Sequence, residues 1–367
     1  NHLFFRVLVG FYFCQVASMM RVNVSTLDRG LIPINMYALN LSVSGTGKGF
    51  STNIMENSVT HLFRKRFIDE TFNVLAQDAL PKLALKKANK NGTDPDDELK
   101  KLEKEFASSG SLAFNFDSAT VPAVKQFRHK LLLAEAGSLN LQIDEIGSNF
   151  VNSLEVLTMF LELYDQGMVK QKLTKNTADS VRSEEIFGKT PTNMMGFGTP
   201  SKLLNGSKVE DDLYDMLETG YARRCFFGFN TASDKITDMT PEEVFNTLTD
   251  QKGNAFLEYF ALRLEQLADV INANKNLVMS KDTSILLIEY KLLCEKEADA
   301  LPEHDEIRKA ELSHRYFKVL KLAGAYAFID DSAEVKEEHI YYAIKLAEES
   351  GEAFGRLLTR DRSYVKL

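Results

Sequence analysis

The stretch Ser42-Val43-Ser44-Gly45-Thr46-Gly47-Lys48-Gly49 decides how the rest of the chain is interpreted. An apolar run, Met36 to Leu39, precedes it, and a segment with helical spacing follows it. A strand, a glycine-rich turn ending in Gly-Lys and a helix together indicate a phosphate-binding loop. The glycines let the backbone wrap an anion, the start of the helix offers unpaired N–H groups, and the lysine reaches the outer phosphates. We therefore expect a nucleotide to be bound by Ser44, Gly45, Thr46, Gly47, Lys48 and Gly49.

The loop departs from the usual phosphate-binding motif at two positions. Ser42 stands where the first glycine is normally found, and Gly49 stands where a hydroxyl residue normally helps to hold magnesium. Ser51 lies too far along the expected helix to be an obvious substitute. Short motifs also occur by chance, so other parts of the chain have to support this one.

Length and composition restrict the class of protein. With 367 residues the chain can form one large domain or two ordinary ones, and its hydrophobic fraction of 44% argues against disorder. The net charge of −8 means that a nucleic-acid partner needs a local basic surface, such as the channel of a ring. Three scattered cysteines without metal spacing indicate a reducing compartment, so we expect a cytoplasmic protein.

The first twenty residues raise the question of a membrane. Leu3 to Met20 is apolar, but Arg6, Gln15 and Ser18 interrupt it and it falls short of a comfortable span. It also lacks the basic start and the cleavage site of a signal peptide. We expect a buried helix packed on the following domain and no membrane partner. Because the chain begins with Asn1 rather than methionine, we expect it to be either a trimmed chain or a piece of a longer one.

The pattern of apolar residues predicts an α/β core followed by helices. Expected strands cover residues 36–43, 111–116, 139–146, 192–199 and 225–229, and the apolar run before the loop suits a parallel sheet that is covered on both faces. Expected C-terminal helices cover residues 241–250, 252–274, 282–298, 304–329 and 336–358. We divide the chain into an N-terminal helical segment (1–30), a core (31–235) with a helical insertion at 68–107, and a C-terminal helical domain (236–367).

Two adjacent carboxylates support the phosphate loop. Asp144 and Glu145 end the apolar strand that follows the helical insertion. In phosphate-loop enzymes a carboxylate at the end of a neighbouring strand holds magnesium, and the next one can polarise the attacking water. An apolar run that ends in Asp-Glu is also a common way to start a helix, and that alternative stays open.

Other polar residues fall at strand ends or on a C-terminal helix. Thr199 ends the next strand and could orient water near the γ-phosphate, although Thr also favours a simple turn before proline. Arg223 and Arg224 precede the last core strand, where either could reach the nucleotide of a neighbouring subunit as an arginine finger or remain solvated. Arg315, on a C-terminal helix, is a further candidate for contact with the nucleotide.

The order of these stretches resembles that of a known family, the ATPase/helicase module of replication proteins from phages, plasmids and other mobile elements. The similar stretches are INMYALNLSVSGTGKGFSTN, FNFDSATVPAV, SLNLQIDEIGSNF, NMMGFGTPSKL, ETGYARRCFFGF and RYFKVLKLAGAYAF. These proteins have a phosphate-loop NTPase core of the AAA+ or RecA-like type and are often joined to a primase. The resemblance implies an ATP-driven, magnesium-dependent motor, a homo-oligomeric ring, most often a hexamer, that moves along single-stranded DNA.

The resemblance also implies roles for individual residues. Lys48 becomes the phosphate-binding lysine, Asp144 the magnesium ligand and Glu145 the carboxylate that activates water. Thr199 falls on a sensor-like strand tip, and Arg223 or Arg224 becomes the arginine finger. Gly49 cannot supply the usual metal-binding hydroxyl, which leaves the magnesium shell incomplete.

The implied partners are single-stranded DNA, a primase and other replication proteins, in the bacterial host cytoplasm if a phage encodes the chain. Lys170, Lys172 and Lys175 lie between two core strands, where a loop could line the channel and bind DNA phosphates, or could be an ordinary polar loop. Two other functions stay open: a nucleotide-binding loader or scaffold with weak turnover, and a packaging or remodelling ATPase that acts on protein.

Overall fold

The computed structural model describes residues 2–43, 48–169, 188–230, 240–249 and 252–359. Its described strands form two four-stranded sheets, in the orders β4-β5-β3-β6 and β2-β1-β7-β8. The first sheet consists of β3 (Tyr37–Ser42), β4 (Leu139–Ile143), β5 (Thr192–Gly198) and β6 (Cys225–Asn230). The second sheet consists of β1 (Asn23–Thr26), β2 (Gly30–Pro33), β7 (Asn276–Met279) and β8 (Glu334–Val335). The protein is therefore of the α/β class, as the sequence predicts.

The larger sheet is parallel throughout, and it sets the position of every residue that follows a strand. Leu41 of β3 lies opposite Gly198 of β5 on one side and Phe229 of β6 on the other. All six residues of β3 are buried, as expected for a central strand with both faces covered. The strands all end at one border of the sheet, which we call the carboxyl edge, and all begin at the other, the amino edge. Residues that follow β3, β4 and β5 therefore gather at the carboxyl edge.

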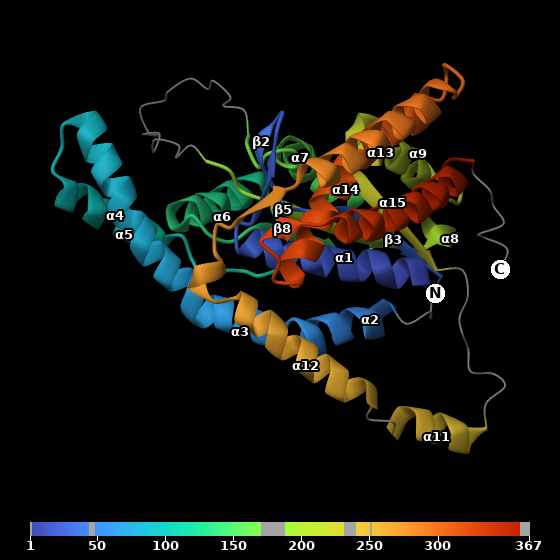
Figure 1. The fold of residues 1–367 in the computed structure, drawn as a ribbon, viewed down its shortest axis with the longest axis horizontal. Helices are drawn as coiled ribbons and strands as arrows, with labels where there is room; N and C mark the ends of the chain where they lie inside the picture. The colour runs from blue at the N-terminus through green and yellow to red at the C-terminus, as the bar shows by residue number, and fades with distance from the viewer. Residues whose placement is uncertain (1, 44–47, 170–187, 231–239, 250–251, 360–367) are drawn as a thin grey trace.

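Helices surround this sheet (Figure 1). Those that precede the last core strand are α1 (His2–Met19), α2 (Lys48–Ile54), α3 (His61–Arg66), α4 (Phe72–Asn91), α5 (Pro95–Ser108), α6 (Val121–Ala134), α7 (Ile146–Leu163), α8 (Pro200–Leu203), α9 (Lys208–Met216) and α10 (Ala222–Arg224). The later ones are α11 (Pro241–Thr249), α12 (Lys252–Leu267), α13 (Lys281–Asp299), α14 (Glu306–Ile329) and α15 (Glu337–Leu358). Short π-helical turns, η1 (Met55–Val59), η2 (Phe67–Thr71) and η3 (Leu217–Tyr221), and a 3₁₀ turn, η4 (Val270–Asn272), complete the set.

The N-terminal helix is an integral part of the core, as predicted. Helix α1 packs against β3, β5, β6 and α14, and its buried polar groups bond to asparagines of the sheet. The Asn193 amide donates to the Ser18 hydroxyl at 2.7 Å and to the Asn140 side-chain oxygen at 2.8 Å, while the Asn40 amide donates to the Phe4 carbonyl at 3.1 Å. These three bonds link α1 to β3, β4 and β5 and so hold the helix and the strands in one register.

The predicted insertion is a helical hairpin. A nearly continuous helical run from α2 to α4 leads away from the sheet, and α5 returns antiparallel to it (Figure 1). Helix α4 ends at Gly92, whose φ of 68° is left-handed. Helix α5 starts with Asp94 as its N-cap, which accepts from the backbone N–H groups of Asp96 and Asp97, and with Pro95 at its first position.

Two predictions about strands need correction. Residues 111–116 do not form a strand, because only Phe116 pairs with the sheet, through a single parallel bridge to Leu141. Phe114 instead packs edge-on against Phe63 of α3. The second sheet is absent from the predicted strands. Its strands have two to four residues each, and β1 pairs with β7, which is far away in the sequence, through Asn23 and Asn276.

The C-terminal helices appear where the sequence predicts them, but they share the core of the sheet. One hydrophobic cluster of buried side chains extends from Phe4 to Leu357 and includes residues of α14 and α15. Phe227 of β6 stacks on Phe354 of α15 with ring centres 4.3 Å apart. Across the described residues, no helix combines the length and apolarity needed to cross a membrane.

Gly324 in α14 marks the closest approach of this helix to the second sheet. A Cβ atom there would lie 2.5 Å from the Val24 Cγ2 atom and 2.9 Å from the Ile34 Cδ1 atom. Alanine normally stabilises a helix by about 1 kcal/mol over glycine, but overpacking costs about 1–3 kcal/mol. We therefore expect Gly324→Ala to lower the free energy of unfolding by up to about 2 kcal/mol in urea denaturation.

Gly253→Ala in α12 is the matched control, because no atom in the described part of the chain lies within 4 Å of its added Cβ. This variant should be as stable as the wild type or slightly more stable. A Gly324→Ala protein that unfolds at the same urea concentration as the Gly253→Ala protein would contradict the close contact between α14 and β1.

Candidate functional site

Three of the four strands of the parallel sheet deliver predicted site residues to the carboxyl edge. Lys48, the first residue of α2, follows β3, and its Nζ atom donates to the backbone carbonyl of Asp144 at 2.6 Å. The same Nζ atom lies 5.2 Å from the centre of the Phe197 ring in β5. The Lys48 side chain therefore lies between the ends of β4 and β5.

Glu145 and Thr199 meet at the same edge. The Thr199 hydroxyl donates to the Glu145 Oε2 atom at 3.5 Å, and the Lys202 Nζ atom lies 3.8 Å from that oxygen. Both residues occupy N-cap positions, of α7 and α8, yet neither side chain makes a capping hydrogen bond. The alternative explanations were a helix start for Glu145 and a simple turn for Thr199. They agree with the backbone positions of the two residues, but they do not explain why the two side chains point toward each other.

Asp144 presents an exposed carboxylate beside this pair. Its strand is not adjacent to that of Lys48, because β5 lies between β3 and β4. The expectation that the carboxylate ends a neighbouring strand is therefore wrong in detail, although the carboxyl edge brings the residues together. An exposed carboxylate is the kind of hard oxygen ligand that magnesium accepts alongside water and phosphate oxygens.

Glycines in β5 let the helices start close to the strands. A Cβ atom on Gly196 would lie 2.7 Å from the Ile146 Cδ1 atom, and one on Gly198 would overlap the Leu203 side chain. Ile146 and Leu203 belong to α7 and α8, whose N-caps are Glu145 and Thr199. The small residues of β5 thus allow the close approach that places these two side chains within reach of each other.

The structure provides no obvious substitute for the missing hydroxyl at Gly49 within α2. Gly49 is exposed, and no atom of the described residues lies within 4 Å of the position that its Cβ would take. Ser51 is 3% exposed, and the Thr52 hydroxyl donates to the Lys48 carbonyl at 3.1 Å. The other predicted members of the loop, Ser44, Gly45, Thr46 and Gly47, lie outside the described residues, as do Lys170, Lys172 and Lys175.

The two arginines lie at the amino edge, since they immediately precede β6. The Arg224 guanidinium donates to the Gly220 carbonyl at 3.1 Å and to Asp165 at 3.4 Å, so it is held within its own chain. Burial and the neighbouring Arg224 charge lower the pKa of Arg223, which forms no ion pair within the described part of the chain. Neither arginine belongs to the cluster around Lys48 in the same chain.

Arg315 lies inside the protein rather than at the carboxyl edge. Its guanidinium pairs with Glu311 at 2.7 Å and with Glu348 at 3.0 Å, and its side chain is 7% exposed. Lys318 joins the same network through Glu311 at 2.7 Å and also donates to the Cys225 carbonyl at the start of β6. Although burial by itself raises the pKa of Glu311, the charges of Lys318 and Arg315 keep it below its usual range. We therefore remove Arg315 from the candidate site.

Sequence reasoning missed two side chains of the site. Lys202 pairs with Glu145, and Phe197 lies under the Lys48 amine. The signal for Lys202 is its spacing of three residues from Thr199 at the start of a helix, which places the two on one face. Phe197 gives no such signal, because its position depends on the pairing of β5 with β3.

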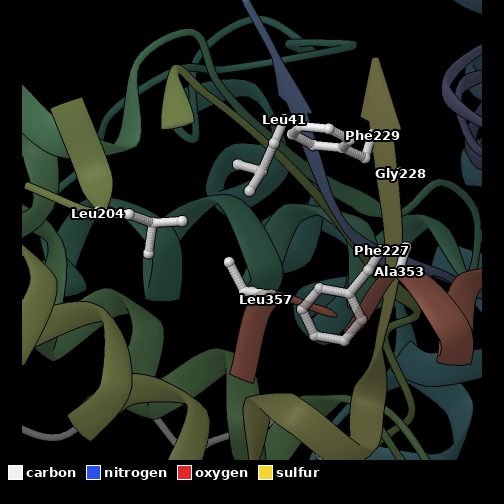
Figure 2. A pocket seen from close by; sticks show the side chains of 7 residues that line it. All are labelled: Leu41, Leu204, Phe227, Gly228, Phe229, Ala353 and Leu357. Atoms are coloured by element: carbon white, nitrogen blue, oxygen red, sulfur yellow. The ribbon is translucent and has the colours of Figure 1, made fainter. Parts of the chain in front are cut away.

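An apolar pocket opens near the same edge (Figure 2). Leu41 and Phe229 come from the ends of β3 and β6, and α15 closes the opposite wall. The lining is completed by Leu204, Phe227, Gly228, Ala353 and Leu357. None of these seven described residues has a charged or hydroxyl side chain, so this lining suits an apolar or aromatic group.

A scan of the chain against models of protein families finds no match, and a search among curated proteins finds none either. The function therefore has to be argued from the geometry of the site.

The buried network around Glu311 leads to a prediction about stability. Replacing Glu311 with Gln leaves Lys318 and one side of Arg315 buried without their carboxylate, and breaking such a pair costs about 3–5 kcal/mol. We expect Glu311→Gln to lower the free energy of unfolding by about that amount in urea denaturation.

Glu295→Gln is the control, because its pair with Lys291 is well exposed. Removing an exposed pair should cost no more than about 0.5 kcal/mol. Equal effects of the two substitutions would mean that the Glu311 network does not hold α14 in place.

Proposed function

We propose that this chain is the ATP-hydrolysing motor domain of a phage-type replicative DNA helicase or helicase–primase that moves along single-stranded DNA. One observation carries the proposal. The lysine of the glycine-rich loop lies 2.6 Å from the carbonyl of Asp144, and Glu145 and Thr199 meet beside it. Four residues singled out for nucleotide chemistry thus come from three strand ends to one place. Ligands of open α/β sheets bind at this edge.

The residues at this edge suit phosphoryl transfer to water. Lys48 neutralises the outer phosphates of ATP, and its ammonium has three donors, so it can keep its bond to the Asp144 carbonyl. The Asp144 carboxylate is exposed and would hold magnesium, which would neutralise charge on the phosphates. Glu145 accepts a proton from the attacking water, while Thr199 orients that carboxylate and the water.

The arginine finger, which contacts the transferred phosphate, comes from a second copy of the chain. Arg223 and Arg224 lie at the amino edge, opposite the Lys48 cluster, so one chain cannot bring both to its own nucleotide. ATP is therefore bound between subunits of a ring, which we propose to be a hexamer. Arg223 is the better candidate, because Arg224 is held by Gly220 and Asp165. An arginine in this role stabilises the charge that develops on the transferred phosphate.

The absence of a hydroxyl at position 49 favours one alternative, a nucleotide-binding loader or scaffold with weak turnover. Such a protein binds ATP without releasing phosphate, with or without DNA. A packaging or remodelling ATPase would release phosphate at a rate that does not depend on DNA. Phosphate release, measured with and without single-stranded DNA over a range of salt concentrations, separates the three functions.

Lys48→Ala tests the assignment of the site. We expect it to reduce DNA-stimulated ATP hydrolysis by roughly 100-fold or more, because the charge that stabilises the transferring phosphate is lost. Lys281→Ala, at the exposed start of α13, is the control and should keep full activity. A Lys48→Ala protein with full DNA-stimulated activity would show that the site is assigned wrongly.

Gly49→Ser tests whether a hydroxyl is what the magnesium site lacks. A Cβ atom at Gly49 would lie more than 4 Å from the other described atoms that could obstruct it. We expect the serine variant to reach half of its maximal hydrolysis rate at a lower magnesium concentration than the wild type. Gly49→Ala provides the matched control, since it adds the Cβ atom alone. If the serine and alanine variants require the same magnesium concentration, the hydroxyl has no role at this position.

A further inference from the structure

Two helical segments extend from opposite ends of the molecule, and each carries apolar side chains that no other described segment covers (Figure 1). One is the hairpin of α4 and α5. The other, which we call the arm, is formed by α11 and the outer side of α12. Neither segment takes part in the site described above.

The outer side of α4 is basic and partly apolar. Lys82 and Lys86 lie one helical turn apart and are exposed, and Leu85 between them is 53% exposed. Helix α4 contains four lysines and one aspartate. Its other side, which includes Leu80 and Ala84, packs on Leu102 of α5 and Leu133 of α6. We call the exposed side, with Val74, Lys82, Leu85 and Lys86, the basic face.

The arm is acidic and aromatic. Phe245 of α11 and Phe256 and Tyr259 of α12 are 64%, 63% and 61% exposed. The inner side of α12 is buried at Ala261 and Leu264 and packs along α3. Together α11 and α12 contain four glutamates against one lysine and one arginine. The exposed glutamates Glu242 and Glu258 lie beside the aromatic residues.

The two surfaces complement each other. Uncovered aromatic and leucine side chains mark an interaction surface, and the acidic and basic residues around them select the pairing and its register. They cannot meet within one molecule, because the hairpin and the arm extend from opposite ends (Figure 1). They can meet when two copies associate head to tail.

We propose that the arm of one copy packs on the basic face of the hairpin of the next copy. The contact uses a different surface on each subunit, so it is heterologous, and it closes into a ring when the rotation between subunits permits. Phe256 and Tyr259 cover Leu85 in this contact, and Glu242 and Glu258 pair with Lys82 and Lys86.

A second copy suits these surfaces better than nucleic acid does. The acidic arm repels phosphates, and its aromatic side chains lack the positive charge that accompanies base stacking in strand-binding proteins. Asp94, Asp96 and Asp97 lie at the turn of the hairpin, next to the end of α4, and their carboxylates would repel nucleic-acid phosphates. A partner with its own carboxylates and aromatic rings fits the lysines and leucine of the basic face, and the arm provides both.

Charge reversal on each surface tests the proposal without nucleotide or DNA. The hairpin variant is Lys82→Glu with Lys86→Glu, and the arm variant is Glu242→Lys with Glu258→Lys. We expect the wild type to form oligomers at low salt in sedimentation velocity and to dissociate as salt is raised. Each variant alone should be monomeric, because its arm and hairpin carry charges of the same sign. An equimolar mixture of the two variants should form oligomers again, because every contact then joins opposite charges.

Several outcomes would overturn this interface. These are a monomeric wild type at low salt, unchanged assembly of either variant, or a mixture that stays monomeric. If the hairpin variant loses binding to single-stranded DNA while it assembles normally, the lysines serve nucleic acid instead. Lys48→Ala separates this proposal from the proposed function, since this variant should assemble like the wild type even though it cannot hydrolyse ATP.

Discussion

The parallel sheet requires cover on both faces, and the rest of the structure depends on how that cover is supplied. Every residue of β3 is buried, so neither face can be left to solvent. Helix α1 supplies part of the cover and fixes it with hydrogen bonds, from Asn193 to Ser18 and from Asn40 to Phe4. These hydrogen bonds form in only one position of α1 on the sheet, whereas purely apolar contacts would also permit positions shifted along the strands. The N-terminal helix therefore helps to define the register of the strands that carry the candidate site.

The direction of the strands separates two kinds of charge. Lys48, Glu145 and Thr199 gather where the strands end, and the arginines lie where β6 begins. No rearrangement of side chains can join the two groups within one chain, because the length of the sheet lies between them. A site that uses both groups must be shared between copies. The hairpin and the arm extend from opposite ends of the same molecule. The proposed head-to-tail contact between copies therefore also covers their exposed apolar side chains.

Most of the larger sheet and the long helices could be predicted, because they follow from local patterns. The apolar run before the loop and the helical spacing after residue 240 identify their elements without knowledge of contacts. The alternation of Leu112, Phe114 and Phe116 failed as a strand signal because Phe114 packs on Phe63 of α3 and only Phe116 bridges to β4. The second sheet could not be predicted, since its short strands depend on pairing between β1 and β7. In the site, the strand expected over 139–146 ends at Ile143, so Asp144 and Glu145 follow the strand and Ile146 begins α7. The partners of Lys48 and Glu145 on β5 and α8 depend on tertiary packing.

Arg315 shows why a cation on a helix is hard to assign from sequence. Glu311, Arg315 and Lys318 follow one face of α14 at spacings of four and seven residues, which is a signal for an internal network. Lys321 continues this face and donates to the carbonyls of Pro33 and Tyr164, and burial lowers its pKa to about 7. Lys318 and Lys321 bind backbone carbonyls at the amino edge and so fix α14 near the starts of β3 and β6. The segment before β6 that carries Arg223 is therefore fixed to α14, and the proposed contact of Arg223 with a neighbouring subunit gains accuracy from this rigid support.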